Sequence, residues 1–298
     1  MFKQILVFCL ASFFSLFAPT KSLANSGWEF SFQEFDQTGF FEYTLYHPYS
    51  SQVISKVSLP QDQWIQIIDV KYNFNNKKDF FRLRYGGTGT KFKGEGSDSD
   101  WIIKGSSTLT HYGVMDVFGK SKMVAVDFGT SLFEKETQKV NLVVGWVRQE
   151  TTNELKNIVY HLVNGVDVGD LTQPDNGSCL DGEFSGLVLG INQDLTVRKN
   201  LIFTTELNLS FLRVKAYGHW ANYTPAWNWE NTGRVLGHGI NLGLQYAFSS
   251  QIQAEIGYRY HHAQADGCRE ILNGSLLSQV VDLEIEQEGL YAALMVLF

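Results

Sequence analysis

The sequence predicts an all-β fold, an antiparallel transmembrane β-barrel of about ten strands. Three observations predict it: apolar and polar residues alternate with period two, charged residues lie inside the alternating segments, and the connections are alternately tight and long. A soluble sandwich buries its apolar face, whereas an outer-membrane barrel turns that face to lipid and encloses the polar one. Charges within strands favour an enclosed, wet or ion-paired interior, and they are Asp69, Lys71, Arg82, Arg84, Asp127, Glu206 and Arg259.

Composition excludes several other classes of protein. The 298 residues include 24 Lys and Arg against 31 Asp and Glu, and this acidic balance argues against nucleic acid as a partner. With 18% charged and 14% aromatic residues, the chain is not of the disordered type. Only the N-terminus carries a long apolar run, so a helical membrane bundle is excluded. No phosphate-binding loop or zinc spacing is present, and we expect no cofactor and no bound metal.

Residues 1–24 have the pattern of a secretory signal peptide. Lys3 precedes the apolar run 5–17, and the small residues around 22–24 fit a cleavage site. A membrane anchor is the alternative, but the run is short and ends near Pro19. The remaining residues, 25–298, are expected to form one barrel domain. Export permits disulfides, so Cys179 and Cys268, both expected in loops rich in Gly, Asp and Asn, form either one disulfide or two free thiols.

The alternation is clearest over 236–248 and 251–260, which Ser249 and Ser250 join as a tight hairpin. Further tight turns are expected at 75–78, 134–138 and 199–200. The strands are expected at 29–46, 52–74, 79–92, 106–133, 139–163, 184–198, 201–220, 235–248, 251–265 and 280–298.

Two places depart from this regular pattern. Pro60 falls inside the second strand, where it is tolerated only at a bulge or above the membrane. In the last strand, Leu290 and Leu294 fall on the same face as the acidic residues at even positions of 282–288. Either the acidic half stands above the lipid, or a bulge near Gly289 exchanges the two faces.

Two groups of residues suggest chemistry. Asp98 and Asp100 follow a glycine-rich run, 86–96, in what reads as the second long loop. Carboxylates at i and i+2 of an extended segment point the same way, so together they can hold one water or one proton. The seventh strand ends in His219-Trp220, and His219 is the candidate base because a histidine titrates near neutral pH.

Taken together, these residues make the chain resemble the omptins, a family of ten-stranded outer-membrane proteases. The most specific element is Asp98-Ser99-Asp100-Trp101, and the weaker ones are Val144-Gly145-Trp146 and the seventh strand that ends at His219. The resemblance implies a groove at the extracellular rim in which Asp98, Asp100 and His219 activate a water to cleave a polypeptide substrate. It also implies contact with lipopolysaccharide, extracellular loops and an outer-membrane location.

Two positions depart from the omptin pattern. Tyr217 stands where the family has the aspartate that pairs with the histidine, and a neutral phenol cannot stabilise an imidazolium as a carboxylate does. Lys215 stands where an acid would select basic substrates, and the first loop, 47–51, has no acid either. We therefore expect a substrate-binding surface at Tyr217 and Lys215 of altered specificity, in an endopeptidase whose activity is reduced by the missing carboxylate. The alternative is a non-catalytic barrel, namely an adhesin, a surface-binding protein or a narrow porin.

Two further clusters of side chains are candidate binding sites. His261 and His262 could bind a metal with Asp266 or Cys268, but neighbours on a strand face opposite ways. The fourth long loop is rich in aromatic residues, which form either a ligand-contact patch or a membrane-interface belt: Trp220, Tyr223, Trp227 and Trp229.

Overall fold

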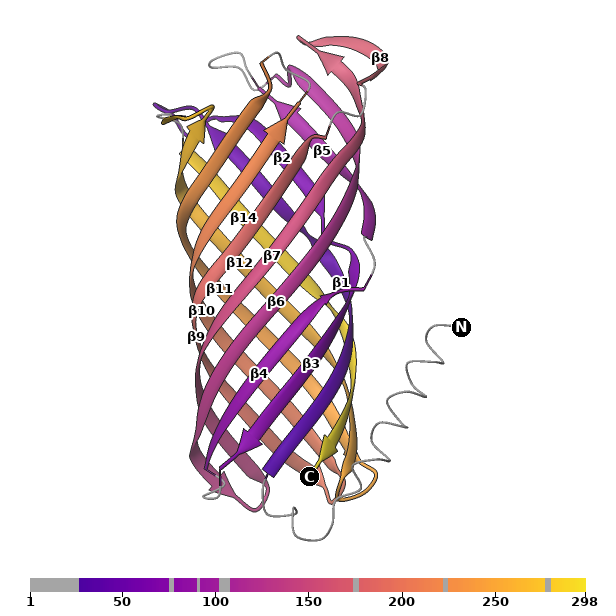
Figure 1. The fold of residues 1–298 in the computed structure, drawn as a ribbon, viewed down its shortest axis with the longest axis vertical. Coiled ribbons are helices and arrows are strands. Elements are labelled where there is room, and N and C mark those ends of the chain that lie inside the picture. The colour runs from indigo at the N-terminus through magenta and orange to yellow at the C-terminus, as the bar shows by residue number, and fades with distance from the viewer. Residues whose placement is uncertain are drawn as a thin grey trace.

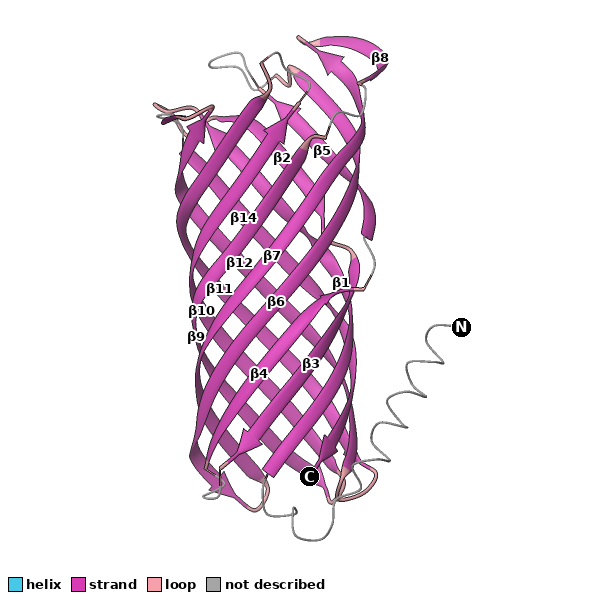
Figure 2. Cartoon of the chain, viewed as in Figure 1, coloured by secondary structure: helices cyan, strands magenta, loops and turns pink. Residues whose placement is uncertain are grey.

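The chain folds into one closed antiparallel barrel in the computed structural model (Figure 1). The structure describes residues 27–74, 78–89, 92–101, 108–173, 177–221, 225–276 and 280–298. The predicted signal peptide lies outside these residues. Figure 2 shows strands and loops along the described chain, and no described helix is long and apolar enough to cross a membrane.

Ten strand positions form the ring, which confirms the predicted number. Strand β1 closes the barrel against β14 in an uninterrupted register from Glu29–Leu297 to Tyr46–Val280. The second and third positions are each built from two pieces. The strands of the ring are β1 (Gly27–Tyr46), β2 (Val53–Pro60) continued by β3 (Gln63–Asn73), β4 (Asp79–Thr88) continued by β5 (Phe92–Asp100), β6 (His111–Lys135), β7 (Gln138–Val163), β9 (Cys179–Arg198), β10 (Leu201–Trp220), β11 (Trp227–Ala247), β12 (Ile252–Leu272) and β14 (Val280–Leu297).

The barrel has two unlike ends. At the turn end, where the C-terminus lies in Figure 1, strands join through the tight connections predicted at 134–138, 199–200 and 249–250. The turn predicted at 75–78 lies mostly outside the described residues. At the loop end, β7 extends into a hairpin with β8 (Val166–Thr172), and β13 (Ser275–Leu276) adds a short pairing to β12.

The irregular second strand has a simple cause. Strand β2 stops at Pro60, which has no N–H to donate, and β3 resumes at Gln63. Between them the Gln61 N–H still donates to the Gly39 carbonyl at 2.8 Å, and the Gln37 amide donates to the Gln61 carbonyl at 3.0 Å. The ring therefore stays closed across the break.

The expectation of a long loop after residue 92 is wrong. Strand β5 pairs with β6 from Phe92–Gly119 to Asp100–His111, so Asp98 and Asp100 lie on a strand. The glycines of this segment serve packing, because a Cβ at Gly94 would overlap the Pro60 ring and one at Gly96 would lie 3.0 Å from Leu59.

The outer surface is divided into two zones. The half nearer the turn end carries an apolar band of exposed outward residues on every strand of the ring, as predicted for lipid contact. Beyond it the outward positions become polar, for example from Phe211 to Arg213 on β10 and from Leu290 to Glu288 on β14. The band includes Phe30, Ile68, Leu83, Phe128, Val144, Leu189, Leu209, Leu244, Ile256 and Leu294.

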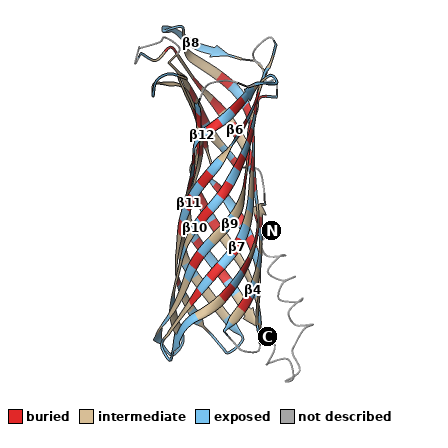
Figure 3. Cartoon of the chain, turned by 90° about the vertical axis from the view of Figure 1, so that its left-hand side faces the viewer, coloured by how far each residue is buried: buried red, intermediate tan, exposed pale blue. Residues whose placement is uncertain are grey.

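The acidic half of β14 stands above the band without exchanging faces. Its register with β1 runs unbroken through Gly289, and outward and inward residues alternate to the end of the strand. Of the two alternatives for this strand, the first is correct. Figure 3 shows the same alternation of buried and exposed residues along the other strands.

The interior is divided as well. In the turn-end half, the predicted charges pair across strands: Asp127 accepts from the Arg82 Nε at 2.9 Å and from an Arg84 Nη at 2.8 Å. Glu206, on the opposite part of the ring, accepts from Arg82 at 3.2 Å. A polar interior was predicted for the whole barrel, and this half confirms it.

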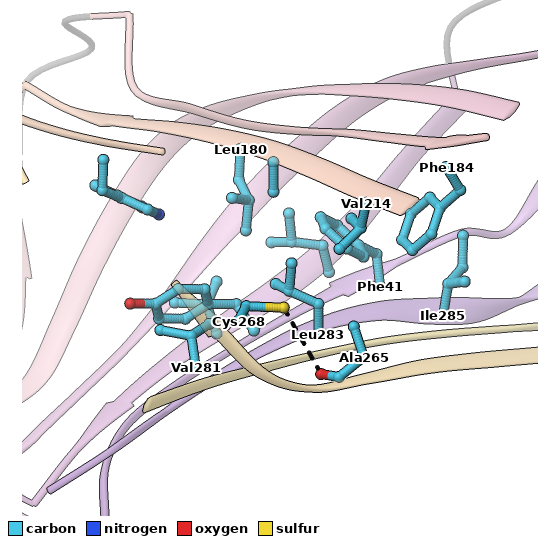
Figure 4. Packing of buried hydrophobic residues seen from close by; sticks show 14 of the residues in the cluster. Phe41, Leu180, Phe184, Val214, Ala265, Cys268, Val281, Leu283 and Ile285 are labelled. Atoms are coloured by element: carbon cyan, nitrogen blue, oxygen red, sulfur yellow. Dashed lines mark hydrogen bonds between the residues drawn. The ribbon is translucent and has the colours of Figure 1, made fainter. Parts of the chain in front are cut away.

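The loop-end half of the interior is instead filled by an apolar core, which corrects that prediction. Its outer face lies in water rather than lipid, so the apolar side chains turn inward as they do in a soluble barrel. Figure 4 shows part of this core, in which members of β1, β9, β10, β12 and β14 meet: Phe41, Leu180, Phe184, Val214, Ala265, Cys268, Val281, Leu283 and Ile285.

Both cysteines of the described chain are free thiols. Cys268 lies inside strand β12 rather than in a loop, and its Sγ is 3.9 Å from the Ala265 carbonyl oxygen within the apolar core. Cys179 begins strand β9. The disulfide alternative is therefore not the one that the structure adopts.

Candidate active site

Asp98 and Asp100 lie side by side on the inner face of β5, near the loop end. In register, Asp98 stands between Val57 of β2 and Gly113 of β6, and its residue exposure is only 7%. Asp100 stands between Ser55 and His111, and the Ser55 hydroxyl donates to its carboxylate. The prediction that both carboxyls point the same way is confirmed.

Burial controls the protonation of this pair. Removal from water raises the pKa of Asp98 well above its usual range, and the neighbouring Asp100 charge raises it further. Burial also raises the pKa of Asp100, but the Ser55 hydroxyl and His111 favour its charged form and oppose the rise. The pair is therefore suited to hold one proton, which resides preferentially on Asp98.

A third acid, Glu270 of β12, is buried in the same interior. The Tyr43 hydroxyl donates to Glu270 Oε2 at 2.5 Å, and the Asn231 amide donates to the same oxygen at 3.0 Å. Burial, Glu270 and the charges of Asp98 and Asp100 together raise the pKa of Tyr43. These five side chains form the inner acidic cluster: Tyr43, Asp98, Asp100, Asn231 and Glu270.

His219 lies on the other side of the barrel wall. On β10 the inward positions are Ala216, Gly218 and Trp220, so His219 points outward. There its Nδ1 lies 2.6 Å from the Asn228 side-chain oxygen. Among the described residues no hydrogen bond or ion pair links His219 to Asp98 or Asp100.

Tyr217 and Lys215 share this outward face with His219. The Tyr217 hydroxyl donates to the Asn228 oxygen at 3.2 Å, and Lys215 stands opposite Glu183 of β9. Both line a shallow depression of the outer wall together with residues of β7, β9 and β11. The structure thus brings the predicted residues together as two groups, Asp98 with Asp100 inside and Lys215, Tyr217 and His219 outside.

Aromatic rings occupy the inner wall near the end of β10. A Cβ at Gly218 would overlap the Trp229 indole, so glycine is required there. Trp220 lies 6.2 Å from Trp229, ring centre to ring centre, and both belong to the apolar core. The predicted aromatic loop patch is therefore wrong for these two residues. Trp227 is exposed, and Tyr223 lies outside the described residues.

His111 is a neighbour of the pair that no sequence motif indicates. It faces Asp100 across the β5–β6 pairing and favours the charged form of that carboxyl. Its Nε2 accepts from the Asn164 N–H at 3.4 Å, and its Nδ1 lies 3.4 Å from the Thr110 hydroxyl. Only a hairpin prediction across the connection between Asp100 and His111 would have paired the two residues.

Metal chemistry finds no support in the described ranges. His261 lines the interior whereas His262 points outward and meets Glu284 at 2.8 Å, as expected for neighbours on a strand. Within those ranges, no group of three or more His, Cys, Asp or Glu side chains is placed to hold a metal ion.

The comparisons with known proteins agree with the fold. No protein-family model matches the chain, and no curated protein sequence does. Among solved structures, the chain is similar to the outer membrane protease OmpT from Escherichia coli, with a TM-score of 0.79 and 10% identity over 94% of this chain and 99% of that one. It also matches the translocator domain of the autotransporter NalP from Neisseria meningitidis (TM-score 0.39, 8% identity, 99% and 96% covered) and a Pseudomonas aeruginosa FadL homologue (0.27, 8%, 92% and 90%). The chain therefore has the fold of an outer-membrane β-barrel, and its predicted resemblance to the omptins holds at the level of the fold.

Proposed function

We propose that this protein is a non-catalytic outer-membrane barrel that binds partners at its loop-end surface, the alternative left open by the sequence. One observation carries the proposal: the inward side chains at the end of β10 are Ala216, Gly218 and Trp220, so that wall offers no base to the aspartate pair. An attacking water needs a base within hydrogen-bond reach, directly or through one further water. His219, the predicted base, faces away from the pair. His111 stands beside Asp100, but its Nε2 already accepts from the Asn164 N–H and its Nδ1 lies 3.4 Å from the Thr110 hydroxyl.

Solvent access to the aspartates supports the same proposal. Asp98 is buried in the apolar core, and the cluster beside it is internally hydrogen-bonded through Tyr43 and Glu270. Val57, the neighbour of Asp98 on β2, is a buried member of the apolar core. The cluster thus resembles a structural polar network more than an open groove.

The loop end offers surface for binding a partner. The β7–β8 hairpin projects beyond the ring (Figure 1), and all residues of β8 are exposed. Val166 and Leu171 keep 62% and 45% of their surfaces exposed, and apolar side chains gathered in water mark interaction surfaces. With the apolar band in the outer membrane and the loops extracellular, this hairpin would face the surroundings of the cell.

An endopeptidase is the second candidate. The buried pair Asp98 and Asp100 and the likeness in fold to OmpT favour it. In that case the water would be activated by Asp98 and Asp100, with His219 recruited by a rearrangement of the end of β10.

Two measurements on the mature chain in lipopolysaccharide-containing micelles separate the candidates. We expect no cleavage of a mixed peptide library by the wild type, and no difference from D98A or H219A. In planar bilayers we expect no stable ion conductance, because the apolar core fills the loop-end half of the interior. Cleavage that both substitutions abolish would establish the endopeptidase, and steady conductance would establish a porin.

A further inference from the structure

A cavity of about 130 Å³ lies inside the barrel, between the apolar core and the ion-paired interior of the turn-end half. Phe184 and Leu212 line its side toward the core, and Asp127 and Glu206 line the opposite side. A volume of this size exceeds the room for one water, which is roughly 10–15 Å³ on the same measure.

Three buried polar atoms of this cavity have no hydrogen-bond partner, and each of them can donate. Arg84 Nε, Gln287 Nε2 and the Ser210 hydroxyl are buried and have no acceptor in the protein, and all three residues line the cavity. Ser210 and Gln287 are 2% and 6% exposed. Gln287 already uses its oxygen to accept from Gln149 at 2.9 Å, so its amide nitrogen is the group that remains free.

Apart from the Ser210 hydroxyl, which can also accept, the buried acceptors without a donor lie outside the cavity. Among the described residues, the buried side-chain oxygens of amides without a donor belong to Asn141, Asn192 and Asn231, and none of these lines the cavity. Burial of an unpaired donor is unfavourable, so three such donors lining one cavity favour a ligand that accepts hydrogen bonds.

The positive charge of Arg259 also favours an anion in this cavity. Arg259 lines the cavity, and its recorded hydrogen bonds go to neutral groups, with Nε at 3.1 Å from Asn241 Oδ1 and Nη2 at 2.7 Å from Gln33 Oε1. In the described chain Arg259 forms no ion pair within 4.0 Å, and Glu206 and Glu255 attract its charge from farther away. Asp127 and Glu206, by contrast, already accept from Arg82 and Arg84.

We propose that this cavity binds one small monovalent anion, a halide or a short carboxylate, which accepts from Arg84, Ser210 and Gln287 and compensates Arg259. The apolar core lies on one side of the site and the ion pairs of the turn-end half lie on the other. The site is independent of the proposed binding function and of any proteolysis.

The test refolds the mature chain into zwitterionic micelles in chloride, bromide or gluconate at equal ionic strength. We expect the thermal unfolding midpoint to rise with the logarithm of chloride or bromide concentration, as for one site that binds only the folded state, and to stay constant in gluconate, which is too large for the cavity. General screening of surface charge would act in all three salts alike. Equal midpoints in all three would overturn the proposal.

Two further measurements make the result specific. Gln287→Leu and Ser210→Ala are expected to weaken bromide affinity at least tenfold, whereas Asn141→Ala, a buried amide outside the cavity, leaves it unchanged. Crystals of wild-type protein refolded in bromide should show an anomalous peak in the cavity, so the proposal stays testable if a variant does not fold. A cavity that contains only water in those crystals would refute it.

Discussion

Arg213 of β10 lies directly opposite Arg234 of β11, and both side chains are exposed on the outside of the barrel. They stand one outward step above Phe211 and Leu236, the last apolar residues of their strands before the polar zone. Like charges directly opposite on a sheet destabilise it. This pair therefore lies at the level where lipid phosphates would neutralise it.

We predict that this pair contacts the phosphates of lipopolysaccharide. Without lipid, Arg213→Gln should stabilise the barrel slightly, by about 0.2–1 kcal/mol, because it removes the repulsion. With lipopolysaccharide the same substitution should reduce the stabilisation that the lipid gives. Thermal unfolding with and without lipopolysaccharide checks both signs. Arg269→Gln, an exposed arginine nearer the loop end, is the control, and an equal loss there would contradict the prediction.

The protonation of Asp98 should be visible in the stability of the barrel. Because burial raises its folded pKa, the native state binds an extra proton. The stability that this proton gives is complete below the unfolded pKa of about 3.9 and is lost as pH rises through the folded value. Asp98→Asn, which is always neutral, should therefore be more stable than wild type at pH 8, and the gap should close toward pH 4.

Urea unfolding at several pH values measures this gap. Asp116→Asn is the matched control, because hydrogen bonding to Asn157 lowers the pKa of that exposed carboxyl. Its effect should be small and opposite in sign. Parallel pH profiles of D98N and wild type would mean that Asp98 is ionised in the folded barrel.

Packing at the inner end of β10 predicts a sharp sensitivity to one methyl group. Gly218→Ala places a Cβ in the Trp229 ring and should destabilise the barrel by about 1–3 kcal/mol. Gly89→Ala is the control, because the nearest atom to its Cβ would be 3.8 Å away. Urea unfolding of the two variants tests this. If G218A were as stable as G89A, the indole would not fill this wall.

The two thiols should resist alkylation in the folded state. Burial raises the pKa of Cys268 to about 12 and that of Cys179 to about 11, with nearby carboxylates adding to both. Maleimide at pH 7 should therefore label the native protein slowly and the urea-unfolded protein rapidly. Rapid labelling of both thiols in the native barrel would contradict the prediction. Cys179→Ser should leave the non-reducing gel mobility unchanged.

The fold was predictable because its main signal is local. Alternation with period two survives in every strand, and the tight turns are marked by short polar pairs such as Lys199-Asn200. The strand pairing between β5 and β6 was not predictable, since the glycines at 94 and 96 read as a loop. Only the neighbouring Pro60 and Leu59 explain their small size.

The site was predictable in part. The common direction of Asp98 and Asp100 follows from their spacing, and the structure agrees. The direction of His219 depends on whether the odd or the even positions of β10 face inward. The apolar residues of this strand occupy odd positions over 207–211 and even positions over 212–220. The change marks the passage of the strand from lipid to water, so side-chain direction is constant while polarity reverses. A motif match compares residue types and not side-chain directions, so it does not reveal this change.

That reversal fixes the depth at which the barrel sits. Sliding the cylinder inward by one outward step would carry Arg148, Arg213 and Arg234 together below the boundary with the hydrocarbon. Each buried arginine would cost up to about 2–4 kcal/mol near the middle of the bilayer and less close to its edge. Moving it outward by the same distance would expose the apolar side chains of Leu290, Phe211 and Leu236 to water. The sequence thus sets how deeply the barrel inserts, and the loop-end half carries the β7–β8 hairpin beyond the lipid.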